Sequence, residues 1–360
     1  MSKIDALFKV MIESGASDLH MSAGNKPRIR KAGNLVEIEQ SPVLTNDINK
    51  ALLFEILNEK ERIQFEQTKD YDFAYPLDEL KVRFRGNIFE NKNGVSAVFR
   101  QIPTEIKSAE ELGLSPLILN FARLHKGLVL VTGATGSGKS TTLAAMLDYI
   151  NKNRKAHIIT IEDPIEFVHT NQMCLVNQRE VHKDTGSFSS ALKSAIREDP
   201  DVILVGEMRD LETIELAITA AEMGLLVYGT LHTSSAAKTV DRIINVFPAD
   251  AQTQVRASLG DCLKGVVAQQ LLKTVDGKRV AAQELLVGTP AVCNLIREGK
   301  TFQIPSLMQT GRKEGMLLMD MAIEDLLKAG RVSGDEAFLK STIKANFEKY
   351  VKDKALLHQV

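Results

Sequence analysis

The sequence predicts an α/β protein that is built from two unequal parts. The chain has 360 residues, which exceeds the length at which a single hydrophobic core usually stops growing. Beyond residue 117, apolar runs alternate with helical patterns, as in a parallel sheet with helices on both faces. The first hundred residues instead mix short helices with hairpin signals. We therefore expect a small domain over 1–100, a linker over 101–116, and a larger domain with C-terminal helices over 117–360.

The small domain should begin with an amphipathic helix over residues 2–14, with Ser2 as its cap. Two short strands should follow around the turn signals Gly24-Asn25 and Gly33-Asn34, and then a pair of helices over 46–67. The stretch VRFRGNIFENKNGVSAVFR alternates apolar and polar residues on either side of Asn93-Gly94. This pattern predicts a β-hairpin.

The larger domain should contain a parallel sheet, because its strand-like runs are almost wholly apolar. We expect, in chain order, strand 128–132, a helix from 139, strand 157–161, helix 188–198, strand 202–205, helix 211–223 and strand 225–230. Residues 236–350 should add helices and two further strands, near 266–272 and 279–286.

Composition excludes several classes of protein. A net charge of −1 gives no global basic field for wrapping nucleic acid, so we expect no nucleic-acid partner. The first twenty residues lack the apolar core of a signal peptide, and no apolar run reaches the length of a membrane-spanning helix. We expect a cytoplasmic protein without direct membrane insertion. Its three distant cysteines, Cys174, Cys262 and Cys293, should be buried free thiols.

A phosphate-binding loop is the strongest motif in the chain. The stretch LVLVTGATGSGKSTT, residues 128–142, matches G-x-x-x-x-G-K-[ST] between an apolar strand and a helix. Backbone N–H groups and the helix N-terminus would hold phosphate, Lys139 would reach the β- and γ-phosphates, and Ser140 would ligate Mg²⁺. The alternative is a tight turn without a ligand. The predicted ATP-binding residues are Gly133, Ala134, Thr135, Gly136, Ser137, Gly138, Lys139, Ser140 and Thr141.

Hydrolysis also needs a carboxylate that orients or deprotonates the attacking water. The strand at 157–161 ends in Glu162-Asp163-Pro164-Ile165-Glu166, at the sheet edge where ligands of doubly wound folds bind. We expect Glu166 to be the base, because Pro164 stiffens the turn before it. A solvated acidic loop is the alternative.

In nucleotide hydrolases an apolar strand of this kind usually ends in an aspartate that holds Mg²⁺ through water. In DVILVGEMRD, residues 201–210, the residues after the strand are instead Gly206 and Glu207. We expect this strand to neighbour the phosphate-loop strand, so that Glu207 reaches the Mg²⁺ shell from one residue further out. Gly206 would then avoid crowding the phosphates. The alternative for Glu207 is a surface ion pair with Arg209.

A histidine follows the next strand, in LLVYGTLHTSS. Its position at a third strand end predicts that His232 contacts the γ-phosphate and relays phosphate loss to the helix that follows. A purely structural histidine is the alternative.

Four motifs together resemble a known family. GATGSGKST at 133–141, ITIEDPIEF at 159–167, VGEMRD at 205–210 and TLHTSSA at 230–236 are similar, in order and spacing, to those of the secretion ATPases of type II and type IV pilus systems. Within that family the chain resembles the retraction branch most. The similarity extends from GASDLH near residue 15 through RFRGN and AVFRQIP to NLIREGK and QTGRKEGM.

The resemblance implies a PAS-like N-terminal domain, a RecA-like C-terminal domain and a homohexamer that holds nucleotide between the domains. It implies Glu166 as catalytic base, Glu207 as the acid near the metal and His232 as a nucleotide-linked contact. It further implies that arginines of the first domain approach the phosphates, by position Arg83, Arg85 and Arg100. An arginine clamp would stabilise the transferring phosphoryl group, although each could equally be a solvated strand residue.

The implied function is an ATP-hydrolysing motor that powers pilus retraction and twitching motility. It would work at the inner membrane through the pilus platform protein, with a second retraction ATPase as a further partner. The family's assembly members carry a longer N-terminal region and a CxxC pair that this chain lacks. In the family's AIRNLIRE-like stretch, Val292-Cys293 replaces an aliphatic-arginine pair.

Three alternatives stay open at this point. One is an accessory or regulatory paralogue of the retraction motor, which Val292-Cys293 favours. Another is an assembly or type II secretion ATPase, and a third is a ring that acts on nucleic acid.

Overall fold

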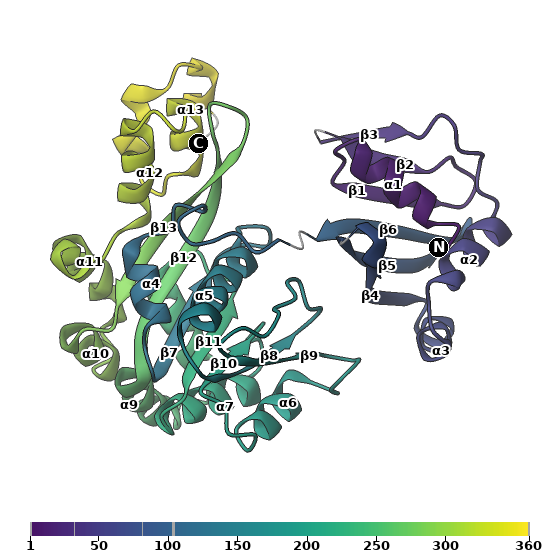
Figure 1. Ribbon diagram of the computed structural model, residues 1–360. Helices are drawn as coiled ribbons and strands as arrows, with labels where there is room; N and C mark the ends of the chain where they lie inside the picture. The colour runs from purple at the N-terminus through teal and green to yellow at the C-terminus, as the bar shows by residue number, and fades with distance from the viewer. Residues whose placement is uncertain (1, 32, 81, 103–104, 359–360) are drawn as a thin grey trace. The chain divides into compact units, whose positions relative to one another are not determined.

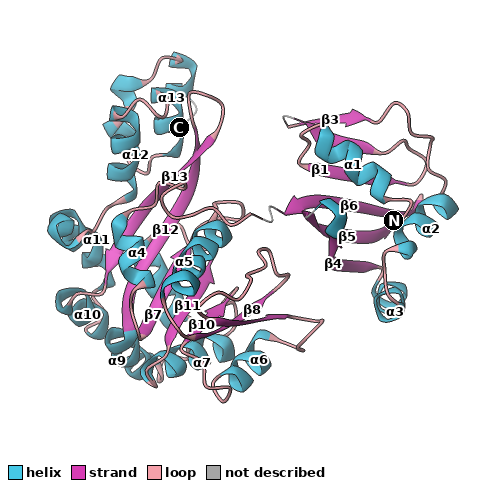
Figure 2. Ribbon diagram, viewed as in Figure 1, coloured by secondary structure: helices cyan, strands magenta, loops and turns pink. Residues whose placement is uncertain are grey.

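The computed structural model describes residues 2–31, 33–80, 82–102 and 105–358 (Figure 1). The chain divides into two compact units, Met1–Glu105 with Pro164–Val168, and Ile106–Asp163 with His169–Val360. Each unit combines one sheet with helices, so the expected α/β class is confirmed (Figure 2). The linker over 101–116 stays a prediction, and its residues 103–104 lie outside the described part.

The first unit contains a six-stranded antiparallel sheet in the order β3-β2-β1-β6-β5-β4. Its strands are β1 (Asp18–Ser22), β2 (Arg28–Lys31), β3 (Asn34–Glu37), β4 (Asp70–Leu77), β5 (Val82–Asn91) and β6 (Gly94–Ile102). Its helices are α1 (Asp5–Glu13), α2 (Asn46–Glu55) and α3 (Glu59–Thr68). Three strands precede α2 where two were expected. The third, β3, is exposed along its length and so has no alternating apolar face to reveal it.

One face of this sheet forms the core with the three helices. Phe8 of α1 stacks on Phe84 of β5, with ring centroids 4.2 Å apart, and meets Phe99 of β6 edge to face at 4.9 Å. The expected cap at Ser2 is wrong, because the helix begins after Ile4 without a side-chain cap. The Ser2 N–H instead donates to a carboxylate oxygen of Asp5, 2.7 Å away.

The predicted hairpin is present as β5 and β6, but its turn lies one residue earlier than expected. Asn91 pairs with Gly94, which leaves Lys92 and Asn93 as the loop. Gly94 is the first residue of β6 and has φ of 119°, a conformation that glycine adopts without steric cost. The sequence signal therefore located the hairpin and misplaced its turn by one position.

The second unit contains a seven-stranded sheet in the order β13-β12-β7-β11-β10-β8-β9. Its strands are β7 (Gly127–Thr132), β8 (His157–Glu162), β9 (Leu175–Glu180), β10 (Val202–Val205), β11 (Leu226–Leu231), β12 (Leu263–Lys273) and β13 (Arg279–Val287). All neighbours are parallel except β12 and β13, which form an antiparallel pair at one edge. The edge strand β9 was not predicted, because its half-exposed polar sequence lacks an apolar run.

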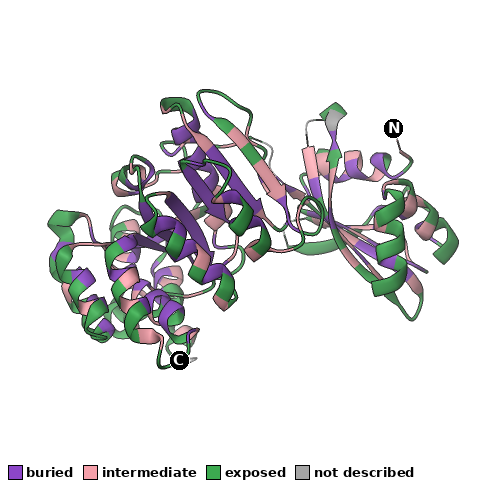
Figure 3. Cartoon of the chain, turned by 90° about the horizontal axis from the view of Figure 1, so that it is seen from below, coloured by how far each residue is buried: buried purple, intermediate pink, exposed green. Residues whose placement is uncertain are grey.

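Helices cover both faces of this sheet, as the alternation predicted. They are α4 (Pro116–Ala122), α5 (Lys139–Asn153), α6 (Phe188–Ala195), α7 (Leu211–Glu222), α8 (Ala236–Asn245), α9 (Gln252–Cys262), α10 (Pro290–Arg297), α11 (Ile304–Thr310), α12 (Met319–Lys328) and α13 (Gly334–Lys340). Helices α4 and α5 pack on one face, and α6 to α11 on the other. The central strands are consequently buried (Figure 3).

The strands β12 and β13 extend past the rest of the sheet to the C-terminal helices (Figure 1). There Leu272 and Ala282 join Ile323 of α12 and Phe338 of α13 in a separate apolar cluster. The hairpin therefore belongs both to the main sheet and to the packing of the C-terminal helices.

Among the described residues, no helix combines the length and the apolarity that a membrane crossing needs.

Candidate functional site

The loop over 133–138 joins β7 to α5 in a conformation that depends on its glycines. Gly133, Gly136 and Gly138 have φ of 144°, 77° and 89°. Gly138 is also the N-cap of α5, so the helix begins at Lys139, as predicted. These backbone angles are strained for any other residue, and they form the tight turn that brings a helix N-terminus towards an anion.

The lysine of the motif lies across this loop. The Lys139 ammonium donates to the carbonyl oxygens of Gly133, at 2.9 Å, and Ala134, at 3.1 Å. The Ser137 hydroxyl is buried and has no hydrogen-bond partner among the described residues. A buried polar atom of this kind usually has a partner, and a phosphate oxygen would supply one. The loop thus has the charge, the helix terminus and the polar group that a nucleotide needs.

A buried glutamine, Gln269, which was not predicted from the sequence, is hydrogen-bonded to the phosphate loop. Gln269 of β12 donates through Nε2 to the Ser137 carbonyl, 2.7 Å away, and its Oε1 accepts from the Thr142 hydroxyl at 2.8 Å. It also accepts from Gln283 of β13, at 3.0 Å. A Cβ on Gly138 would lie 2.8 Å from the Gln269 amide nitrogen, so glycine is needed there for space too. A buried amide within an apolar strand was the available signal.

The predicted strand neighbours need one correction. Strand β10 does not pair with β7, because β11 lies between them. The phosphate loop, His232 and Glu207 follow β7, β11 and β10, which are consecutive in the sheet, and Glu162 ends the next strand, β8. The four strand ends therefore lie in one row, although Glu207 is one strand further from the loop than expected.

Glu207 and His232 contact each other across this row. The imidazole Nε2 of His232 lies 3.1 Å from Oε1 of Glu207. Arg209 also donates to the same carboxylate oxygen, and this hydrogen bond raises the pKa of Arg209. The ion pair weighed as the alternative for Glu207 is thus present. The same carboxylate nevertheless touches His232, which follows β11, the strand next to β7.

The backbone of β8 gives a reason for glycine at position 206 that the sequence did not reveal. A Cβ on Gly206 would lie 2.9 Å from the carbonyl oxygen of Ile161 and 3.2 Å from Cα of Glu162. The Gly206 N–H also donates to that carbonyl, 2.8 Å away, and its own carbonyl accepts from Thr230. Glycine is needed here because β8 approaches closely, and crowding of the phosphates stays a prediction.

Replacing Gly206 with alanine should therefore destabilise the second unit by about 1–3 kcal/mol, the usual cost of overpacking. We expect a lower midpoint of thermal unfolding with little change in the KM for ATP. Gly186→Ala is a matched control, since a Cβ there meets nothing within 4 Å. A changed KM at an unchanged unfolding midpoint would instead indicate that a side chain at position 206 crowds the phosphates.

The acids after β8 occupy different surroundings. Oε1 of Glu162 accepts from the Thr160 hydroxyl at 2.6 Å and from the Gln178 amide at 3.1 Å, so these groups hold it in place. Asp163 is exposed. Glu166 lies in Pro164–Val168, which is grouped with the first unit, so its role as the base stays a prediction.

The predicted arginines lie on the sheet face of the first unit opposite its helices. Arg85 and Arg100 are direct partners across β5 and β6, and Arg83 is two residues from Arg85 on the same face. Both Arg85 and Arg100 are exposed, whereas Arg83 is half-buried. Arg100 donates through Nε to Asp18 of β1, 2.8 Å away. Their approach to phosphates stays a prediction.

The buried carboxylate of Asp18 gives this face a pH dependence. Burial would raise the pKa of Asp18, but hydrogen bonds from Ser17 and Arg100, with the positive charge of Arg100, lower it overall. A lowered pKa contributes stability above the ordinary value near 3.9, and this contribution disappears as the pH falls through the native pKa.

We therefore expect the stability difference between the wild type and Asp18→Asn to be largest near neutral pH and to shrink below about pH 4. Unfolding of the full chain, followed across that range, measures it. Asp72→Asn, on an exposed position of β4, serves as the control. A difference that is independent of pH would contradict the assignment.

The three cysteines are buried free thiols, as expected. Burial raises the pKa of Cys262 to about 12 and also raises that of Cys293. In α10, Val292 and Cys293 face inward, with 0% and 8% of their surface exposed. The Val292-Cys293 pair in the AIRNLIRE-like stretch is thus buried, at the position where the family has an aliphatic residue and a positively charged arginine.

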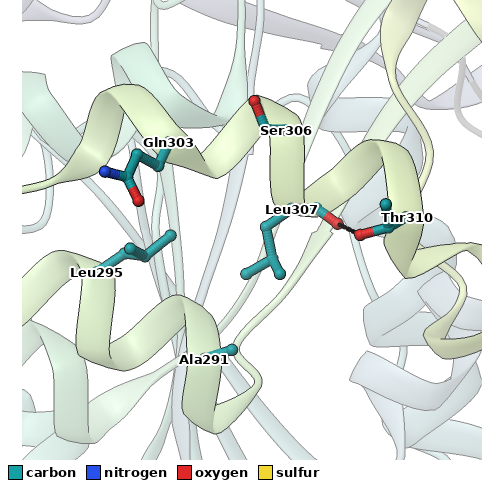
Figure 4. A pocket seen from close by; sticks show the side chains of 6 residues that line it. All are labelled: Ala291, Leu295, Gln303, Ser306, Leu307 and Thr310. Atoms are coloured by element: carbon teal, nitrogen blue, oxygen red, sulfur yellow. Dashed lines mark hydrogen bonds between the residues drawn. The ribbon is translucent and has the colours of Figure 1, made fainter.

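A cavity of about 490 Å³ lies on the outer side of the same helix (Figure 4). It is formed between α10 and α11, with Gln303 just before the start of α11. The lining residues are Ala291, Leu295, Gln303, Ser306, Leu307 and Thr310, none of which belongs to the phosphate loop.

Magnesium would fit the residues at the strand ends. No group of three or more His, Cys, Asp or Glu side chains in the described ranges could hold a metal alone. Mg²⁺ does not need one, because it keeps several waters and binds through one or two protein groups plus substrate phosphates. The Ser140 hydroxyl and the Glu207 carboxylate are the groups that would hold it, and the ion would neutralise phosphate charge.

A phosphate loop at the end of a parallel sheet, with an acid and a histidine at the neighbouring strand ends, defines a P-loop ATPase. The family described as type II/IV secretion system protein matches residues 1–346, and the chain belongs to it.

Known relatives cover nearly the whole chain. A type IV pilus retraction ATPase, PilT, of Pseudomonas aeruginosa is 52% identical over 344 residues, which cover 96% of this chain and 99% of the relative. The type IV pilus ATPase PilU of the same organism is 41% identical over 336 residues, which cover 93% of this chain and 87% of the relative. The crystal structure of the pilus retraction motor PilT with bound ADP has a TM-score of 0.89 and 44% identity, and covers 97% of this chain and 99% of the other. The predicted resemblance is confirmed.

Proposed function

We propose that the protein is an ATP-hydrolysing motor that powers retraction of type IV pili. The observation that carries the proposal is a complete phosphate loop beside the Glu207–His232 pair, in a chain 52% identical to a pilus retraction ATPase. The ADP bound in the related crystal structure supports nucleotide at the corresponding loop.

The loop residues would perform distinct parts of the reaction. Lys139 would exchange its two carbonyl acceptors for phosphate oxygens and so neutralise their charge. The Ser137 hydroxyl would gain the partner it lacks. Glu166 would take the proton of the attacking water, and the arginines on the first unit's sheet would stabilise the charge that develops on the transferring phosphoryl group.

Phosphate loss would be sensed at the neighbouring strand ends. His232 contacts Glu207, and the loop that carries it leads directly into α8. A contact to the γ-phosphate by either side chain would disappear on hydrolysis, and the loop could then adopt a second arrangement. Switching of this kind converts a local chemical event into movement of an attached element.

The complete motor would be a homohexameric ring that is held at the inner membrane by the pilus platform protein, with a second retraction ATPase as a further partner. Purified protein should show Mg²⁺-dependent ATPase activity and form rings in electron micrographs with an ATP analogue and magnesium. Deletion of the gene should abolish twitching motility. Absence of Mg²⁺-dependent hydrolysis in folded protein would overturn the proposal.

An accessory role is the second candidate, and Val292-Cys293 is the observation that favours it. Identity to the retraction ATPase, 52%, nevertheless exceeds identity to the second pilus ATPase, 41%. Deletion of the gene alone distinguishes the roles. It should abolish motility if this protein is the principal motor and leave motility intact if the protein is accessory. Restoring an aliphatic-arginine pair at 292–293 does not separate the two roles, because Cys293 is buried and the change should destabilise the fold in either case.

A further inference from the structure

The β12–β13 hairpin contacts the phosphate loop on one face and the C-terminal helices on the other. Successive residues of a strand point to opposite faces of a sheet. Gln283 donates to Gln269, which holds the Ser137 carbonyl of the loop. The next residue, Glu284, faces α8 and α12 instead. Gln283 therefore contacts the residue that holds the phosphate loop, and its neighbour Glu284 contacts α8 and α12.

The Glu284 carboxylate joins the beginnings of two helices. Oε1 accepts from the N–H of Ala236, the first residue of α8, at 2.7 Å, and Oε2 accepts from the N–H of Met319, the first residue of α12, at 3.2 Å. The side chain is only 6% exposed. Burial raises its pKa, and the two N–H groups oppose that effect. Because helix N-termini favour an anion, one carboxylate can hold both ends.

The α8 end of this link is bonded to residues 232–235, the loop between β11 and α8, which is called the phosphate-facing loop below. Ser235 caps α8, and the Thr233 hydroxyl lies 2.7 Å from the Thr239 hydroxyl in the first turn of α8. The Thr239 hydroxyl donates to the Ser235 carbonyl, 2.7 Å away, and lies 3.4 Å from the hydroxyl of Thr132, the last residue of the phosphate-loop strand. With the contact between His232 and Glu207, hydrogen bonds connect the strand ends to the start of α8.

The α12 end of the link is fixed to β13. Leu317 pairs with Leu285 through two backbone bonds, of 2.7 and 2.9 Å. Only one residue separates this pair from Met319. The helix then packs on α13 and the hairpin tip, in the cluster that contains Leu272 and Phe338. A shift of Glu284 would therefore reach the first turn of α12 directly.

We propose that Glu284 is a positioning residue that couples the phosphate-facing loop to α12, so that nucleotide at the phosphate loop orders the first turn of α12. The proposal rests on the proposed function, because it requires nucleotide at that loop. Coupling of this kind is reciprocal, and it exists only if nucleotide favours one arrangement of the linked elements.

A pair of variants at Met319 isolates the hydrogen bond. Met319→Pro removes the N–H that donates to Glu284, and proline is favoured at the first position of a helix. Leu318 has φ of −79° and ψ of 153°, which a following proline permits. Met319→Ala is the matched control, because it loses a similar amount of side chain and keeps the N–H. Comparison of the two therefore cancels the lost packing.

Glu284→Gln tests the same link from the other side, because an amide has only one acceptor oxygen for two N–H donors. Glu284→Ala is less useful, since both buried donors would lose their partner and the fold could fail. Gln270→Ala is the control on the hairpin. Its amide donates to the Lys340 carbonyl of α13, at 3.1 Å, and it reaches a different helix from α8 or α12.

Hydrogen exchange of the full chain, with and without ADP, provides the readout at α5 and at residues 320–328. In the wild type, Met319→Ala and Gln270→Ala, ADP should slow exchange at 320–328 by at least about fivefold, the lower end of typical couplings. In Met319→Pro and Glu284→Gln, that slowing should vanish while protection of α5 by ADP persists. If Glu284 had only a structural role, the variants would change exchange at 320–328 equally with and without ADP.

Two results would overturn the proposal. One is an equal effect of ADP at 320–328 in all five proteins, and the other is no effect there in the wild type while α5 is protected. If ADP protects neither region of the wild type, the nucleotide site fails, and both the proposed function and this coupling fall together. The behaviour of α5 thus separates the two failures.

Discussion

Lys139→Ala should abolish ATP hydrolysis while leaving the protein folded. The ammonium group donates to the Gly133 and Ala134 carbonyls of the loop and would donate to phosphate once nucleotide is present. Removing one fixed donor from a charge-stabilising site typically costs about 10²–10³ in turnover. We expect a loss of at least that size in steady-state ATPase assays. ADP binding should also weaken, because Lys139 would contact the phosphates of both ATP and ADP.

The control for this experiment is another lysine of the same helix. Lys152 pairs with Asp148 at 2.7 Å on the half-exposed side of α5, away from the loop. Lys152→Ala should retain wild-type turnover and binding. If Lys139→Ala hydrolyses ATP at the wild-type rate, the loop is not the catalytic site.

Glu166→Gln and Glu207→Gln should both lose turnover, but for different reasons. A general base contributes about 10²–10⁴-fold, so Glu166→Gln should lose activity on that scale and still bind nucleotide. Glu207 contacts His232 and Arg209 at a strand end, where it can hold a metal through water. Glu207→Gln should therefore lose turnover and, in addition, need more Mg²⁺ for half-maximal activity.

Magnesium titrations of ATPase activity, beside direct measurements of ADP affinity, distinguish the two roles. Glu212→Gln is the matched control, since Glu212 is an exposed carboxylate in the first turn of α7, five residues after Glu207. It should behave as the wild type does. Equal Mg²⁺ dependence in Glu166→Gln and Glu207→Gln would show that the assignment of the two carboxylates is wrong.

Local sequence predicted the strand, glycine-rich turn and helix correctly because the required residues lie close together, over 128–142. The glycines, the lysine and the apolar strand before them are sufficient to specify a strand, a turn and a helix in that order. The central strands β7, β8, β10 and β11 were also predictable, since a strand that is buried on both faces must be apolar throughout. Edge strands β3, β4 and β9 have no such constraint, and they were missed.

What the sequence determined by itself was the α/β class, the phosphate loop and the family motifs at successive strand ends. Only the tertiary structure decided which strands are neighbours, that Gly206 makes room for β8, and that Gln269 and Glu284 reach from one hairpin to the loop and to two helices. The physical reason is the separation along the sequence of the residues that are in contact. A motif is held by bonds between residues near in sequence. The partners of Gln269 and Glu284 in the loop and the two helices are instead 35 to 132 residues away, and no local pattern encodes them.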